Sequence, residues 1–145
     1  MYRFNFTIRV LAYGYFLILF FAVIGVRLFG LLNFSVPHGY NLNLFANVSD
    51  FGVNLSGHSL LSRFDWWFNV ILFIGYPTAF SVLVSNVKLY KVWVMAVFSS
   101  FCIEILQYLL DLGTADINDL IANSLGALIG CFFTFLLNRL FLSRY

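Results

Sequence analysis

Apolar residues are gathered in four long runs, separated by shorter stretches that hold most of the polar side chains. An α-helix rises about 1.5 Å per residue, so about 20 apolar residues are needed to cross the hydrocarbon core of a bilayer. Each run comes close to this length. We therefore predict an all-α membrane protein, an antiparallel bundle of four transmembrane helices in a single domain over residues 1–145. The expected helices are about Val10–Leu32, Phe68–Val84, Val92–Leu110 and Leu120–Leu142.

The first apolar run could be confused with a secretory signal. It is too long for one, and no small-x-small cleavage site precedes the polar stretch that follows it. We expect this run to remain in the protein as a membrane anchor.

The longest polar connection, from about Asn33 to Ser62, joins the first two predicted helices. It is rich in Asn, Ser and Gly, which favours irregular backbone, yet it also contains apolar residues such as Leu42 and Phe51. We expect it to lie on the mouth of the bundle, because these side chains would be poorly placed in water. Long ordered loops are often functional. Both a lid or binding surface and a passive connector remain open.

Composition agrees with a membrane protein. Apolar residues make up 62% of the chain and charged residues only 10%, against about a quarter charged in soluble domains. Too few polar side chains are present to cover the surface of a soluble protein of this length. The net charge of +2 is scattered and forms no block of like charges, which argues against nucleic acid as a partner.

Basic residues lie mostly on one side of the predicted spans, and cytoplasmic segments of membrane proteins keep positive charge. The opposite side carries Arg63 alone among the basic residues of its loops. We therefore expect a multi-pass protein of the cell membrane with both termini in the cytoplasm. The basic residues on the expected cytoplasmic side are Arg3, Arg9, Lys88, Lys91, Arg139 and Arg144.

Polar side chains inside a membrane are costly, so they usually face partners or a cavity. The third run has polar residues at i, i+3 and i+7, a spacing that places them on one helix face, and the fourth run repeats this spacing at its start. The second and first runs add polar residues near their outer ends. We predict a polar pocket open to the outside. Its expected binding residues are Arg27, Arg63, Asp65, Asn69, Glu104, Gln107, Asp116, Asp119 and Asn123.

Most of these residues also have a structural interpretation. Asp116 and Asp119 fit the cap and first turn of the fourth helix. Asn69 and Asn123 could hydrogen-bond between helices. Arg27, in the first run, could extend its long side chain to the outer lipid headgroups.

Glu104 is the strongest candidate for a functional or ion-paired role, because it is too deep and too short to reach water easily. We form the hypothesis that Arg27 pairs with Glu104 or Asp119, since pairing offsets part of the cost of burying charge.

Other features favour packing. Small residues recur at four-residue intervals in the fourth run, at Ala122, Gly126 and Gly130, and such a ladder allows close approach of a neighbouring helix. Cys102 and Cys131 lie inside spans and are interpreted as small apolar residues. The two histidines match no metal motif, and we expect neither a metal nor a cofactor.

Three segments together resemble the VanZ-like family. They are residues 63–73 (RFDWWFNVILF), 103–107 (IEILQ) and 116–127 (DINDLIANSLGA), and the resemblance covers about residues 60–142. It implies a small bacterial membrane protein of a group named for a member linked to teicoplanin resistance. Family members often read Phe-x-Pro-x-Gly after the asparagine of the second span, where this chain has Phe73-Ile74-Gly75-Tyr76-Pro77.

Two function classes follow. The first is a protein of the bacterial envelope that binds a lipid-linked or amphiphilic ligand at the outer leaflet, linked by resemblance to glycopeptide resistance. The second is a small membrane enzyme that uses Glu104 or Asp119 as an acid or base. We favour the binding class. The expected partners are membrane lipids, a lipid-linked envelope precursor or a lipoglycopeptide, and a second copy of the chain, without nucleic acid.

Overall fold

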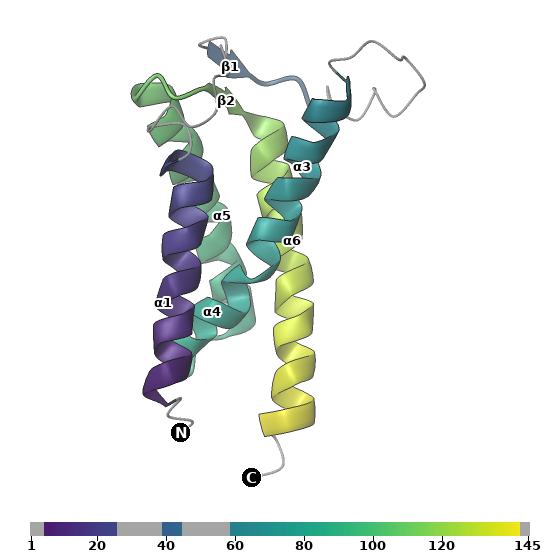
Figure 1. The fold of residues 1–145 in the computed structure, drawn as a ribbon. Coiled ribbons are helices and arrows are strands. Elements are labelled where there is room, and N and C mark those ends of the chain that lie inside the picture. Colours follow the sequence, from purple (N-terminus) through teal and green to yellow (C-terminus); the bar gives the residue numbers. More distant parts are fainter. Residues whose placement is uncertain (1–4, 26–38, 45–58, 143–145) are drawn as a thin grey trace.

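The computed structural model describes residues 5–25, 39–44 and 59–142, with the side chains of residues 59–65 and 141–142 left aside (Figure 1). The predicted all-α membrane fold is confirmed, because four of the described helical segments are long and apolar enough to cross a membrane. These segments are Phe6–Gly25, Trp66–Leu83, Leu89–Leu109 and Ile117–Leu140. The elements in chain order are α1 (Phe6–Phe20), η1 (Phe21–Gly25), β1 (Gly39–Asn41), α3 (Ser59–Ile74), α4 (Tyr76–Leu83), α5 (Leu89–Leu109), β2 (Thr114–Asp116), α6 (Ile117–Leu137) and η3 (Asn138–Leu142).

Figure 1 shows α1, the pair α3 and α4, then α5 and α6 running alternately from one end of the molecule to the other. The two chain ends lie at one end, drawn at the bottom, and the strands β1 and β2 lie at the opposite end. We call the latter the sheet end. α6 packs against both α3 and α5, and α1 packs against α4.

Helices α1, α5 and α6 begin earlier than predicted. α1 and α6 begin at a polar capping residue, whereas α5 begins at Leu89, before the predicted Val92, without a side-chain cap. α1 begins at Phe6, before the predicted Val10, because the side chain of Asn5 accepts a hydrogen bond from the Ile8 N–H at 3.1 Å. α6 begins at Ile117, before the predicted Leu120, because Asp116 is its cap. The part of the first predicted helix beyond Gly25 lies outside the described residues.

The second span is broken at Gly75, between α3 and α4. Pro77 lies in the first turn of α4 and has no backbone N–H to donate to the preceding turn. Close to the break, the hydroxyl of Tyr15 donates to the carbonyl of Leu72. A Cβ at Gly75 would overlap the Tyr15 ring, so glycine permits this contact between α1 and α3.

The predicted small-residue ladder of α6 packs against α3. A Cβ at Gly126 would overlap the carbonyl oxygen of Val70, and one at Gly130 would overlap that of Ile74. Ala122 is fully buried. The two backbones therefore approach closely at Gly126 and Gly130, which holds this part of α6 against α3.

The predicted loop between the first two spans contains a strand, which corrects the expectation of irregular backbone there. β1 pairs in parallel with β2, with Gly39 opposite Thr114, Tyr40 opposite Ala115 and Asn41 opposite Asp116. The loop also ends earlier than the predicted Ser62, because α3 begins at Ser59. The strand pair joins this segment to the start of α6, so part of the loop does lie on the mouth of the bundle.

Candidate functional site

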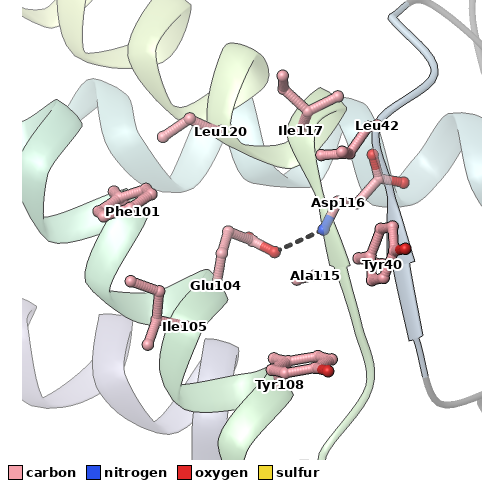
Figure 2. A pocket seen from close by; sticks show the side chains of 10 residues that line it. All are labelled: Tyr40, Leu42, Phe101, Glu104, Ile105, Tyr108, Ala115, Asp116, Ile117 and Leu120. Carbon is pink, nitrogen blue, oxygen red and sulfur yellow. Dashed lines mark hydrogen bonds between the residues drawn. The ribbon is translucent and has the colours of Figure 1, made fainter.

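A pocket of about 390 Å³ lies at the sheet end, between α5, the start of α6 and the segment that contains β1. Figure 2 shows Glu104 in its wall, surrounded by aromatic and aliphatic side chains. Most of the lining is apolar, so this pocket differs from the polar pocket that the sequence predicted. The lining residues are Tyr40, Leu42, Phe101, Glu104, Ile105, Tyr108, Ala115, Asp116, Ile117 and Leu120.

Glu104 belongs to the last turns of α5 and is only 7% exposed. Its carboxylate accepts a hydrogen bond from the backbone N–H of Asp116 at 2.8 Å, drawn as a dashed line in Figure 2. Glu104 thus ties α5 to the strand β2 and, at the same time, places a carboxylate in the pocket wall.

Asp116 is the N-cap of α6, as the structural interpretation of the sequence predicted. Its Oδ1 accepts hydrogen bonds from the backbone N–H and the side-chain Nδ2 of Asn118, both at 2.8 Å. Its Oδ2 accepts from the Nδ2 of Asn41 at 3.0 Å. Both carboxylate oxygens therefore accept hydrogen bonds from other groups of the protein. A direct role of Asp116 in ligand binding stays a prediction.

Asn118 is a site residue that the sequence analysis did not single out. It is 1% exposed, and its Nδ2 donates to the backbone carbonyl of Asn43 at 3.0 Å as well as to Asp116. We call Asn41, Asn43, Asp116 and Asn118 the asparagine clasp, because they join the β1 segment to the start of α6. The sequence signal for Asn118 is its position two residues after a capping aspartate, where a short amide can return to the cap.

Gln107 and Asn123 do not line the pocket. Gln107 is 2% exposed and donates its Nε2 to the carbonyl of Val23 in η1 at 3.0 Å. Asn123 donates its Nδ2 to the hydroxyl of Ser100 at 2.8 Å. The predicted hydrogen bonding of Asn123 between helices is confirmed. The remaining amide oxygens, Gln107 Oε1 and Asn123 Oδ1, are buried and make no hydrogen bond to any residue that the structure describes.

The other predicted site residues are either away from the pocket lining or outside the described part of the chain. Asp119 is in the first turn of α6 and Asn69 is on α3, both partly buried, and neither lines the pocket. Arg27 lies outside the described residues, as do the side chains of Arg63 and Asp65. The pairing of Arg27 with Glu104 or Asp119 and the binding roles of these residues therefore stay predictions. Within the described ranges, no three His, Cys, Asp or Glu side chains are placed to hold a metal ion.

Comparison with known proteins agrees with the segments that pointed to a family. The family model described as VanZ/LLP1 matches residues 6–138, which is nearly the whole chain. No curated protein and no solved structure matches the chain. The family match and the four apolar helical segments lead to the same conclusion: the chain is a multi-pass membrane protein that belongs to the VanZ/LLP1 family.

Proposed function

We propose that the protein binds the hydrocarbon part of an amphiphile in the pocket beside Glu104. The observation that carries this proposal is an apolar pocket with a buried carboxylate, placed in the last turns of a membrane-spanning helix. Glu104 lies about 8 Å before the end of α5 at Leu109, given 1.5 Å per residue. The pocket thus lies near the boundary between hydrocarbon and headgroups, where both ends of an amphiphile find a matching environment.

The pocket is accessible from the side of the helices. Phe101 is 50% exposed, Ile105 41% and Tyr108 48%, although all three line the pocket. In a membrane this exposed flank of α5 would face lipid. An acyl or prenyl chain could therefore enter sideways from the bilayer without first passing through water.

Pocket size favours a single chain. Its volume of about 390 Å³ is near the lower end of small-molecule pockets, which span about 300–1,000 Å³. A segment of one hydrocarbon chain fits such a space, whereas the core of a glycopeptide does not. The polar part of the ligand would remain at the sheet end, near the phenol groups of Tyr40 and Tyr108.

The distribution of basic residues supports an outer-leaflet position for this pocket, because the sheet end is opposite to the chain ends. A lipid-linked envelope precursor or a lipoglycopeptide, presented by its lipid tail, is the ligand class that fits this position. The link of the family's founding member to teicoplanin resistance favours the same class.

Photocrosslinking tests the proposal. The protein would be placed in nanodiscs with a phospholipid that carries a diazirine on its acyl chain, and crosslinked peptides would be identified by mass spectrometry. We expect crosslinks to Phe101, Ile105 and Leu120. Leu120→Trp should fill the pocket and remove them. Leu128→Trp, on the same helix at a 55% exposed position outside the pocket, is the matched control and should leave them unchanged. Crosslinks spread evenly over all exposed helix faces would contradict the proposal.

Catalysis on a lipid is the second candidate, because Glu104 provides a buried carboxylate at a pocket wall. Glu104→Gln keeps the shape and an oxygen that can accept from Asp116 N–H, but it cannot transfer a proton. If the protein is an enzyme, Glu104→Gln should abolish its activity in cells while leaving lipid crosslinking intact. If the protein is a binder of the hydrocarbon chain, this isosteric change should leave both activity in cells and crosslinking nearly unchanged.

A further inference from the structure

We infer that the β1 segment is a releasable wall of the pocket, and that the asparagine clasp controls how fast a bound chain is exchanged. This inference rests on the proposed function, since it concerns the regulation of the same pocket. It starts from a contrast between the walls. α5 and α6 are long helices packed into the bundle, whereas β1 has three residues and, among the described strands, pairs with β2 alone.

A sheet of two short strands is marginal on its own, because it buries little apolar surface. The β1 segment shows this weakness directly. Tyr40 is 71% exposed and Leu42 66% exposed, although both line the pocket. Little apolar area would be lost if this wall moved away, so its position depends on polar contacts.

Those polar contacts converge on two residues at the start of α6. Asn41 donates to Asp116, and Asn118 donates to the carbonyl of Asn43, each at 3.0 Å. Within the segment, the N–H of Asn43 donates to Asn41 Oδ1 at 3.1 Å, which forms a local turn. Because Tyr40 and Leu42 alternate with Asn41 and Asn43, holding the asparagines in place also holds the two pocket-lining side chains.

Asp116 links the clasp to the opposite wall. Its carboxylate accepts hydrogen bonds from the side chains of Asn41 and Asn118, while its backbone N–H donates a hydrogen bond to Glu104. Release of the clasp would therefore open the pocket beside Glu104 and leave α5 in place. The clasp is the point at which opening of the pocket can be controlled.

A disulfide across the clasp tests this inference. Asn41 and Asp116 are directly paired in the sheet and their side chains touch, so Asn41→Cys with Asp116→Cys should form a disulfide when oxidised. The oxidised protein keeps β1 fixed, and the reduced protein lacks the Asn41–Asp116 hydrogen bond of the clasp. All variants would carry Cys102→Ala and Cys131→Ala. Asn41→Ala, which keeps Asp116 as the helix cap, guards against a loss of folding in the double variant. Asn43→Ala is the control, because only the backbone of Asn43 takes part in the clasp.

Two measurements are made on each variant in nanodiscs. Amide hydrogen exchange over residues 40–42 and 114–116 reports the release of β1. Loss of crosslinking after a chase with unlabelled phospholipid reports the release of the diazirine lipid. We expect both rates to rise about tenfold in Asn41→Ala and in the reduced double variant, since a hydrogen bond to a charged group is worth at least this factor. Both should fall below the unmodified protein after oxidation, and Asn43→Ala should match the unmodified protein.

Each contrary result has a distinct meaning. Amide exchange that follows the clasp while lipid release stays constant would overturn the inference and leave the proposed function standing. Amide exchange rates that do not differ between variants with and without the clasp would overturn the inference as well. Absence of pocket crosslinks in every variant, the unmodified protein included, would overturn the proposed function and, with it, the exchange role of β1.

Discussion

Polar side chains within the spans differ in how completely the protein satisfies them. Asp116 has both carboxylate oxygens occupied by donors from Asn41 and Asn118. Within the described ranges, Asn123 and Gln107 each donate one hydrogen bond and keep a buried amide oxygen without one. A buried polar atom without a hydrogen bond lowers stability. These two amides are therefore retained at a cost that packing alone does not explain.

The contact between Ser100 and Asn123 allows this cost to be measured. Ser100→Ala should lower the free energy of unfolding in detergent by about 0.6 to 1.7 kcal/mol, because Asn123 Nδ2 loses its acceptor in the bundle interior. Adding Asn123→Leu should recover part of the loss, because the unmatched Oδ1 is removed with the unpaired Nδ2. If the stability loss in the double variant equals the sum of the losses in the two single variants, Asn123 stabilises the bundle by a route other than its hydrogen bond to Ser100.

The sequence predicted which polar residues share a helix face but not their partners. Glu104 and Gln107 are three residues apart on α5, a spacing that places both on one face of the helix. Nevertheless, Glu104 contacts Asp116 on one side and Gln107 contacts Val23 on the other. Spacing fixes a direction around a helix axis only to within a broad sector. The partner depends on which neighbouring helix occupies that sector, and this is decided by the packing of the whole bundle.

Among the elements, α6 shows how a sequence pattern becomes a contact. The small-residue ladder predicted close packing, and Gly126 and Gly130 do lie against the carbonyls of Val70 and Ile74 on α3. Without a hydrophobic force between helices in lipid, close backbone approach of this kind is a main source of association.

Replacing one glycine of the ladder should therefore separate the helices. Gly126→Ala should lower the free energy of unfolding by about 1 to 3 kcal/mol, because the added Cβ would overlap a backbone carbonyl that cannot rotate away. Gly14→Ala on α1 is the matched control, since nothing lies within 4 Å of its Cβ position. It should leave stability unchanged or raise it by up to about 1 kcal/mol. Thermal or denaturant unfolding in the same detergent compares the two, and equal effects would show that the ladder does not set the packing.

The strand β1 could not be predicted in the same way. Gly39–Asn41 is too short to show alternation, and its pairing with Thr114–Asp116 joins segments far apart in the chain. Such a strand depends on hydrogen bonds to a partner that is distant in the sequence. Helices, by contrast, satisfy their own backbone hydrogen bonds, which is why all four spans could be located from local sequence.

At the scale of the whole molecule, the remaining prediction is orientation in the membrane. Asn43 at the sheet end and Ser85 between α4 and α5 are both exposed, and Figure 1 places these regions at opposite ends. In a protein lacking Cys102 and Cys131, Asn43→Cys should react with an impermeant maleimide added to intact cells. Ser85→Cys should react only after the cells are permeabilised, because positive charge stays in the cytoplasm. The reverse pattern would place the pocket on the cytoplasmic side.

The central position of α6 has a consequence for how the protein is made. α6 packs against both α3 and α5, and its start supplies the cap residue Asp116 and the pocket residues Ile117 and Leu120. A chain synthesised from its N-terminus inserts α6 after α1, α3 and α5. Until α6 is inserted, the backbone carbonyls of α3 and the carboxylate of Glu104 lie in the membrane without the contacts that α6 and β2 later provide. Insertion of α6 is therefore the step that completes the pocket, and a chain released before that step would have the earlier membrane spans but not this pocket.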